Sequence, residues 1–445
     1  MYKRFILHYH LMKSSVRQSF RFFYRRHTVV GFEDVPRNAS VVFVANHQNS
    51  LIDAINIVVV TPPIFQPCFM TRSDVFNEKS EGFLRSIKML PIYRQRDGLD
   101  SIAKNEEVFK IVDEELQNPY SSMIIFPEGS HDTRRLVRPL KKGAARMIFQ
   151  AAQTSDYTLP LYVVPVGLNY SDHDKFHSDL LIIFGKPIDV RNYYDLHRQS
   201  PARAINVLTA DIHPAMAETL IHIPDEENLP LIDSLRKLFT LDQVQEMGLA
   251  PHKALDRFKA DKAVVARMEE TIAAAPEQVP AIAEAYKTYE AGLAALGIRD
   301  HVIRDMPHHP LALLGQVLAL LLTLPVFLYG AVNHYHLYRL CYWIPRKVFK
   351  DPQFHFSVMW LSGYFLYPVS WLLQTLVVGL LTNGPVALAY LVSLPLTGLG
   401  AMAWTRGYKK LIARIKVTFG GKAAAENLKQ QRASLRDMVW GKNKL

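Results

Sequence analysis

Apolar positions along residues 28–192 follow two alternating periods, and this pattern predicts an α/β domain. Short apolar runs of strand length recur there, and stretches with helical spacing separate them. Such alternation is typical of a mixed, largely parallel sheet flanked by helices, with functional side chains on loops at the strand ends. The predicted strands are 41–45, 69–71, 92–93, 123–126, 162–168 and 180–184, and the predicted helices are one after Asp53 and those at 81–89, 101–117 and 144–153.

Residues 1–27 have a helical pattern with one apolar face and one basic face. Apolar residues recur every three or four positions from Phe5 to Phe23, and a cation stands at every fourth position from Lys13 to Arg25. Such a helix lies in a membrane interface with its cations near anionic headgroups, or it packs on the domain with its basic face exposed. The sequence alone leaves both alternatives open.

Residues 193–308 change character. Long helical patterns such as 263–275 and 280–296 dominate, and strand signals are few. We interpret this part as a helical insert or cap that carries no recognisable chemistry.

Three uncharged apolar stretches follow, at 311–332, 357–381 and 385–404, each close to the roughly 20 residues that a spanning helix needs. The short link 382–384 makes the second and third a helical hairpin, and the basic flanks of this hairpin predict two cytoplasmic ends. One crossing by the first stretch would put the next basic loop on the opposite side from a cytoplasmic catalytic domain. We therefore prefer a re-entrant or interfacial helix pair broken at Pro325, with a third crossing as the alternative.

The net charge of +11 is concentrated at the two ends of the chain. Residues 1–30 hold seven Lys or Arg and no acid, and residues 405–445 hold eleven against two, so the remainder carries a net charge of −5. Basic ends on a mildly acidic body favour an anionic membrane lipid surface as partner. Nucleic acid is not expected, because the chain lacks zinc-finger spacing, an RNA-binding aromatic signature and a helix-turn-helix. The membrane region 309–404 is thus followed by a basic tail, predicted to be cytoplasmic.

Cysteine usage and motif spacing limit the chemistry further. The two cysteines, Cys68 and Cys341, lie far apart and predict no disulfide framework, which suits a reducing compartment. The sequence shows no metal-ligand spacing and no glycine-rich nucleotide loop, so we expect neither a metal nor a bound cofactor.

The candidate for chemistry is a histidine at the end of the first predicted strand. The apolar run 43–45 leads into Asn46 and His47, and Asp53 follows six residues after the histidine. A carboxylate beside an imidazole fixes its tautomer and makes it a general base. On one helix the two side chains would diverge by about 120°, so the chain must turn through residues 48–50 to bring them together. The alternative is an Asp that caps the helix beside an incidental His.

Three further blocks lie downstream in order: Leu90–Arg96 (LPIYRQR), Ile125–Ser130 (IFPEGS) and Val163–Gly167 (VVPVG). With the His/Asp pair they resemble the four motif blocks of the glycerolipid acyltransferase family, which includes glycerol-3-phosphate and lysophosphatidate (1-acylglycerol-3-phosphate) acyltransferases. The resemblance covers about residues 28–190, and residues 184–188 are similar to the strand and turn that close the family's domain.

Two departures from the family pattern stand out. Five residues separate His47 from Asp53, where most of the family has four. His131 follows the IFPEGS block, where the family often has an arginine, and Arg134 or Arg135 is expected to take that electrostatic role.

The resemblance implies roles for the block residues. His47 would be the base and Asp53 its orienting partner, and Arg94 would hold a phosphate on the acceptor, with Arg96 as second choice. A surface ion pair of Arg94 and a solvated basic turn at Lys142 are the alternatives. The residues expected to bind substrate are Asn46, Arg94, Arg96, Glu128, Gly129, Ser130 and Lys142.

The implied function is that of a membrane-bound O-acyltransferase of phospholipid synthesis. It would move a fatty acyl group from acyl-CoA or acyl carrier protein, as co-substrate, to a hydroxyl of glycerol 3-phosphate or a lysophospholipid. Two alternatives remain open at this point. They are a phospholipid-remodelling transacylase and a catalytically silent lipid-binding membrane protein.

Overall fold

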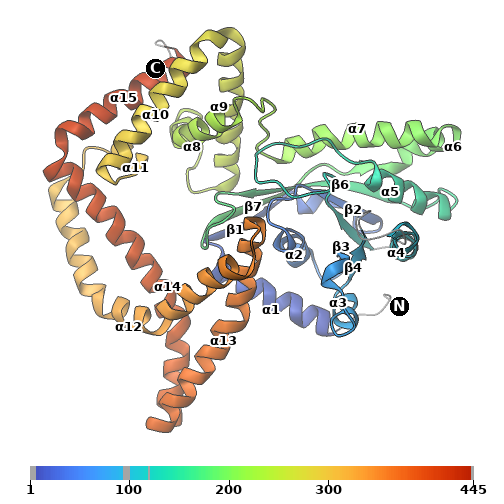
Figure 1. The fold of residues 1–445 in the computed structure, drawn as a ribbon, viewed down its shortest axis with the longest axis horizontal. Helices are drawn as coiled ribbons and strands as arrows, with labels where there is room; N and C mark the ends of the chain where they lie inside the picture. The colour runs from blue at the N-terminus through green and yellow to red at the C-terminus, as the bar shows by residue number, and fades with distance from the viewer. Residues whose placement is uncertain (1–6, 94–100, 119–120, 442–445) are drawn as a thin grey trace. The chain divides into compact units, whose positions relative to one another are not determined.

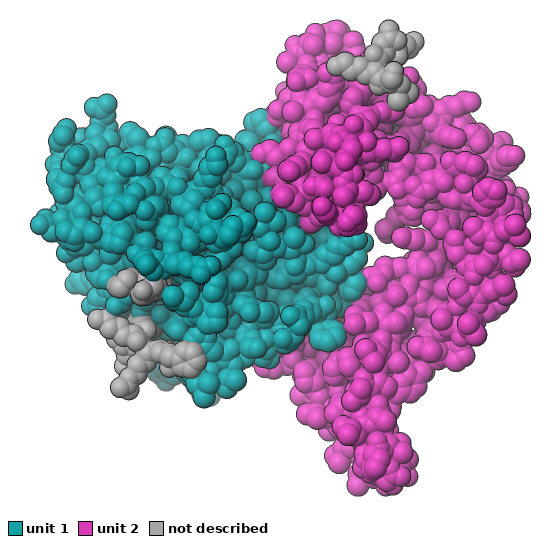
Figure 2. All heavy atoms as spheres, turned by 180° about the vertical axis from the view of Figure 1, so that it is seen from behind, with its two compact units in different colours: residues 1–224, 345–360 teal, residues 225–344, 361–445 magenta. Residues whose placement is uncertain are grey.

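A computed structural model describes residues 7–93, 101–118 and 121–441 of the chain. The chain divides into two compact units, which Figure 2 colours separately. The first comprises residues 1–224 with 345–360, and the second comprises residues 225–344 with 361–445.

The described residues of the first unit form one eight-stranded sheet of order β1-β7-β6-β2-β5-β3-β4, with β8 paired to β6 (Figure 1). Strand pairs are parallel except β6 with β7 and β6 with β8. The predicted mixed, largely parallel sheet is therefore confirmed. The strands are β1 (Arg26–Val30), β2 (Ser40–Ala45), β3 (Cys68–Arg72), β4 (Met89–Ile92), β5 (Ser122–Ile125), β6 (Leu161–Tyr170), β7 (Asp179–Phe184) and β8 (Ile188–Asp189).

Helices cover both faces of this sheet. Val42 and Val44 of β2 join a buried cluster with residues of α4, α5 and α7. Phe43 points to the other face and meets the rings of Phe65 and Phe184, and α1 packs against α2 on that side of the sheet (Figure 1). The helices are α1 (Leu7–Phe23), α2 (Leu51–Val60), α3 (Glu81–Ser86), α4 (Ser101–Leu116), α5 (Gly143–Thr154), α6 (Tyr194–Gln199) and α7 (Pro201–Thr219).

The first unit extends beyond the boundary predicted at residue 192. Helix α7 adds one buried face to the core, because Ala204, Leu208, Ile212 and Met216 recur every four residues and pack with α5. Residues 193–224 thus belong with the sheet rather than with a separate helical insert. Strands β1 and β8 are also present, although the apolar pattern did not predict them.

Pro165 lies in a central strand, whereas proline in a sheet is usually confined to edge strands or strand ends. Strand β6 pairs with β2 along one side, and on the other side its partner changes from β8 to β7 around Pro165. The carbonyl of Pro165 accepts from Gly185 N, in the gap between these two partners. The backbone nitrogen of Pro165, which carries no hydrogen, faces this gap, where no strand of the described sheet offers an acceptor. The sheet therefore loses no hydrogen bond at the proline.

Helix α1 packs its apolar face on the domain. Tyr9, Val16, Phe20 and Phe23 are buried there. Of the two alternatives for this helix, packing on the domain is the arrangement that the contacts show, and membrane contact through its outer face stays a prediction.

Two members of the predicted basic stripe of α1 bind the end of α2. Lys13 Nζ donates to Thr61 Oγ1 at 2.9 Å and to the Phe65 carbonyl at 3.2 Å, and Arg17 Nε donates to the Val59 carbonyl at 2.7 Å. Cations at a helix C-terminus are stabilising because carbonyl groups there lack partners.

The second unit is helical in its described residues. Its C-terminal helix packs on the earlier ones, since Arg432 Nε lies 2.7 Å from Asp300 and Arg432 Nη2 lies 2.6 Å from Asp242. The predicted basic tail is therefore largely a folded helix. The helices of this unit are α8 (Leu229–Glu246), α9 (Ala254–Ala274), α10 (Val279–Leu296), α11 (Asp300–Arg304), most of α12 (Pro310–Val348), the later part of α13 (His355–Leu381), α14 (Gly384–Ile415) and α15 (Lys422–Trp440).

Three helices, α12, α13 and α14, are long and apolar enough to cross a membrane among the residues that the structure describes. Helix α12 runs unbroken through Pro325 from Pro310 to Val348, so the preferred helix pair is not the arrangement found. Polar side chains link these helices, with the Tyr390 hydroxyl 2.6 Å from Asn333 Oδ1 and 3.0 Å from Gln374 Oε1. Such contacts hold helices together in lipid.

We expect replacement of His27 by Phe to flatten the acid side of the stability profile. The His27 ring stacks on Tyr24 at 5.3 Å, and Nε2 has no hydrogen-bond partner within the described chain. Burial, helped by the charge of Arg17, lowers the pKa of His27 from 6.5 to about 4. The unfolded chain therefore binds the proton first, and wild-type stability falls as the pH drops from 6.5 to about 4, by an amount of the order of 3 kcal/mol.

The measurement is the free energy of unfolding of the purified protein between pH 4 and 7. The matched control is His8→Phe, which changes an exposed histidine of α1. Equal pH slopes in wild type and H27F would contradict the expectation.

Candidate active site

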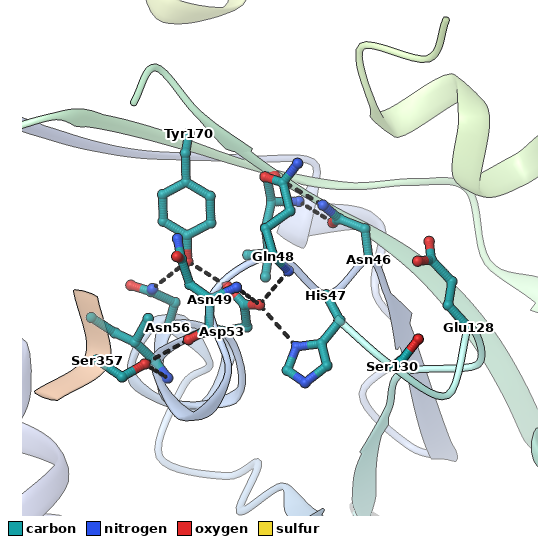
Figure 3. Close-up of polar contacts among 12 residues, drawn as sticks. Asn46, His47, Gln48, Asn49, Asp53, Asn56, Glu128, Ser130, Tyr170 and Ser357 are labelled. Carbon is teal, nitrogen blue, oxygen red and sulfur yellow. Dashed lines mark hydrogen bonds and ion pairs between the residues drawn. The ribbon is translucent and has the colours of Figure 1, made fainter. Parts of the chain in front are cut away.

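A turn between β2 and α2 brings His47 and Asp53 together. Strand β2 ends at Ala45 and α2 begins at Leu51, so Asp53 lies in the first turn of the helix. His47 Nδ1 and Asp53 Oδ2 are 2.9 Å apart (Figure 3). The five-residue spacing therefore does not separate the pair.

The carboxylate of Asp53 is fully buried and has four donors. Besides His47, the backbone N–H groups of Gln48 and Asn49 donate to Oδ2, each at 2.7 Å, and the Tyr170 hydroxyl donates to Oδ1 at 2.6 Å. These bonds compensate the desolvation of a carboxylate that would otherwise be costly to bury. They also fix the orientation in which Asp53 meets the imidazole.

Tyr170 is a site residue that the sequence did not reveal. It ends β6, and its hydroxyl also accepts from Asn56 Nδ2 at 3.1 Å. Burial and the neighbouring Asp53 raise the pKa of Tyr170 well above its usual value, so the phenol stays protonated and donates. The only sequence signal was its position at the end of a strand whose end reaches the site.

The second ring nitrogen of His47 is positioned for proton transfer. Since Asp53 accepts only, Nδ1 carries the proton in the neutral ring and Nε2 is left as an acceptor. Nε2 points away from Asp53 in Figure 3. The imidazole stacks on Phe126, with centroids 4.0 Å apart, and His131 meets it edge-on at 5.4 Å. The stacking holds the plane of the ring.

The loop after β5 places a second carboxylate beside His47. Glu128 is buried, and its Oε2 accepts from Arg138 Nε at 2.8 Å and from Nη2 at 2.5 Å. Arg138 also binds Ser130, with Nη1 2.8 Å from Oγ and Nη2 on the carbonyl. Gly129, which lies between Glu128 and Ser130 in the chain, has a φ of +73°, a conformation that favours glycine.

The arginine that pairs with Glu128 is Arg138, and the electrostatic role expected of Arg134 or Arg135 stays a prediction. Arg134 Nε binds Asp132 at 2.9 Å, and Arg135 Nη2 donates to the Tyr170 carbonyl at 2.8 Å. Hydrogen bonds from Arg134 outweigh burial and lower the pKa of Asp132. Arg138 lies ten positions after Glu128 along an irregular loop, so no periodicity indicated the pairing.

The second carboxylate oxygen of Glu128, Oε1, is buried and has no hydrogen-bond partner among the described residues. Burial raises the pKa of Glu128, and the guanidinium of Arg138 opposes this shift. Glu128 and His47 both line a small pocket, together with Asn46, Gln48, Asp132, Arg134, Arg135, Leu136, Leu168, Asn169, Leu220 and Ile221.

Asn46 supports the site through the sheet. Its Oδ1 accepts from Leu168 N at 2.8 Å and its Nδ2 donates to the Leu168 carbonyl at 3.1 Å. The side chain thus continues the pairing of β2 with β6 for one more step. Substrate binding by Asn46 stays a prediction.

Of the three cations predicted to bind substrate, the described residues include Lys142 alone. Lys142 is exposed just before α5, and Lys141 packs its side chain against Gly129, where an added Cβ would lie 2.7 Å from Lys141 Cδ. Strand β4 ends at Ile92, at the same edge of the sheet as His47. Arg94 and Arg96 lie outside the described residues, so their roles stay predictions.

Part of the chain is similar to known proteins. Residues 26–169 match the family model described as Acyltransferase, which confirms the resemblance seen in the four motif blocks. The matched range contains His47, Asp53, Glu128 and Arg138.

Two curated relatives are similar to part of this chain. Glycerol-3-phosphate O-acyltransferase 2 of Saccharomyces cerevisiae is 25% identical over 231 residues, which cover 50% of this chain and 29% of the yeast protein. An uncharacterized acyltransferase of Schizosaccharomyces pombe is 28% identical over 194 residues, 41% of this chain and 26% of the relative. The chain therefore spans less than a third of the length of either relative.

One solved structure is also similar. The crystal structure of the 1-acyl-sn-glycerophosphate (LPA) acyltransferase PlsC from Thermotoga maritima aligns with a TM-score of 0.30 and 18% identity, over 45% of this chain and 80% of that chain.

We expect Arg138→Met to destabilise the protein by about 3–5 kcal/mol, because it leaves the buried carboxylate of Glu128 without its cation. The double variant Glu128→Gln/Arg138→Met should lose less, since neither charge remains. The measurement is the free energy of unfolding of each variant in a double-mutant cycle.

The matched control is Arg134→Met, which breaks a more exposed pair. Its arginine side chain is 46% exposed, against 17% for Arg138, and a loss below about 1 kcal/mol is expected. Equal losses in R134M and R138M would show that burial does not set the cost.

Proposed function

We propose that the chain is a membrane-bound O-acyltransferase that acylates a phosphorylated glycerol, because residues 26–169 match the family model described as Acyltransferase. The observation that carries the proposal is the His47–Asp53 pair at 2.9 Å, with Asp53 held by three further donors. This is the arrangement that a general base for hydroxyl activation requires.

The proposed reaction begins with proton transfer to His47. Nε2 takes the proton of the acceptor hydroxyl as the oxygen attacks the carbonyl carbon of a thioester. The imidazolium that forms is stabilised by the Asp53 carboxylate on Nδ1. The tetrahedral intermediate then collapses, the carbon–sulfur bond breaks, and the thiolate leaves with the proton from His47. One ester and one free thiol are produced, and no protein nucleophile is needed.

The proposed acceptor is glycerol 3-phosphate, with lysophosphatidate as second choice. Support for glycerol 3-phosphate comes from the similarity to glycerol-3-phosphate O-acyltransferase 2 of Saccharomyces cerevisiae. The free Oε1 of Glu128 would accept a hydrogen bond from an acceptor hydroxyl, and Arg94 would bind the phosphate. The proposed donor is acyl-CoA or acyl carrier protein.

Attachment to a membrane suits such a reaction because its product is an amphiphile. Helices α12, α13 and α14 have the length and apolar character for this. We propose that the first unit lies on the cytoplasmic side, as the basic flanks of the predicted hairpin indicate.

We expect His47→Ala to lower acyl transfer at least roughly a hundredfold, because general-base catalysis contributes about 10²–10⁴-fold. The measurement is thiol release from acyl-CoA, and in parallel from acyl carrier protein, against a panel of glycerol 3-phosphate, lysophosphatidate and other lysophospholipids. His8→Ala, an exposed histidine of the same unit, is the control. Full activity in H47A with intact folding and membrane association would refute the assignment.

The panel also separates the proposal from its alternatives. A remodelling transacylase would transfer acyl groups without an acyl thioester. Lysophosphatidate binding without thiol release would indicate a silent lipid-binding protein.

We expect Arg94→Ala chiefly to raise the KM for the phosphorylated acceptor, since a bidentate contact to phosphate contributes to ground-state binding. Arg96→Ala provides the matched comparison within the same block and should have the smaller effect. Steady-state kinetics at varied acceptor and fixed donor distinguish KM from kcat. An unaltered KM in R94A would remove Arg94 from the acceptor site.

A further inference from the structure

The beginning of helix α13 folds with the catalytic unit, although it lies 300 residues further along the chain. Residues 345–360 belong to the first compact unit. Ser357, in the first turn of α13, is buried with its hydroxyl on the turn that follows His47 (Figure 3). Ser357 Oγ donates to the Asn49 carbonyl at 2.6 Å and accepts from Ile52 N at 3.2 Å.

The catalytic turn needs support of this kind. Ser50 immediately precedes α2 and has a φ of +49°, a strained conformation for a residue with a side chain. Its hydroxyl makes no capping hydrogen bond to the helix. The N–H of Ile52 is among the first four of α2, which have no partner within the helix. Ser357 supplies from another part of the chain the cap that Ser50 does not provide.

Neighbouring residues fix the position of Ser357. Phe356 is buried, with ring centroids 4.9 Å from Phe23 and 6.0 Å from Tyr170. On the next turn of α13, Trp360 Nε1 donates to Ser19 Oγ at 3.0 Å. Phe356, next to Ser357 in the chain, therefore holds the serine against this unit, and its ring touches the tyrosine that binds Asp53.

The same segment also reaches the residues around His47. Phe354 meets His131 edge-on at 5.7 Å, and His131 in turn meets His47 at 5.4 Å. The segment thus contacts both the turn beneath the imidazole and the aromatic group beside it. Such contacts exceed what attachment of a membrane helix would require.

We propose that Ser357 is a positioning residue of the acyl-transfer site, and this inference rests on the proposed function. The Ser357 hydroxyl holds the segment 49–52. It therefore fixes the position of Asp53, which directly follows this segment, and of His47, which lies two residues before it. Helix α13 continues into an apolar stretch long enough to cross a membrane. The helix that enters the membrane therefore sets the geometry of the base, and catalytic alignment depends on that helix being in place.

The test compares Ser357→Ala, Ser357→Thr and Ser19→Ala in the full chain. S357A should lower kcat by roughly tenfold to a hundredfold and leave the KM for the acceptor nearly unchanged, because small displacements of a base cost this much. S357T keeps the hydroxyl and should recover most of kcat. S19A loses the Trp360 contact but leaves the turn untouched, so its kcat should equal that of wild type.

Hydrogen exchange supplies a readout that does not depend on turnover. The Ile52 amide should exchange faster in S357A than in wild type or S19A, as measured on peptides that cover residues 46–53. Wild-type kcat in S357A, an equal loss in S19A, or an equal loss in S357T would overturn the proposal. If the wild-type protein releases no thiol with any acceptor, the proposed function is refuted instead. Hydrogen exchange of residues 46–53 would then still test whether Ser357 holds the turn.

Discussion

The buried carboxylate of Asp53 is the constraint on which the rest of the site depends. A carboxylate in a protein interior is stable only when donors replace the water that it has lost. Four donors converge on Asp53, two of them from the backbone of its own turn, one from His47 and one from Tyr170. The hydrogen bonds to the Asp53 carboxylate therefore shape the turn between β2 and α2, orient the imidazole of His47 and link α2 to the end of β6.

The sheet explains how these donors meet. Strands β2, β5 and β6 are neighbours, and β2 is parallel to both of the others, so their carboxyl ends lie at one edge. His47 follows β2, Glu128 follows β5 and Tyr170 ends β6. Each charged group at this edge is compensated locally, Asp53 by hydrogen bonds and Glu128 by Arg138. The second oxygen of Glu128 is buried with no hydrogen-bond partner among the described residues.

The beginning of helix α13 contributes to this edge as well. Ser357 caps α2 from a helix whose later part is apolar and long enough to span a bilayer. A soluble α/β domain would normally cap such a helix with a residue of its own turn, as Ser50 could have done. Support from α13 instead ties the turn between His47 and Asp53 to a segment that lies about 300 residues further along the chain.

The sequence by itself determined the features that short-range patterns encode. Alternating periods predicted the α/β class and six of the eight strands, and the motif blocks indicated His47, Asp53 and Glu128. Only the tertiary structure decided which side chains complete the site. Arg138 lies 10 positions from its partner Glu128, and Tyr170 lies 117 positions from its partner Asp53. Ser357 lies 304 positions after Asp53. No periodicity in the sequence relates these residues. Their roles come from donors and acceptors that meet only when the sheet closes and α13 packs, because a buried polar group takes its partner from whichever segment folding brings to it.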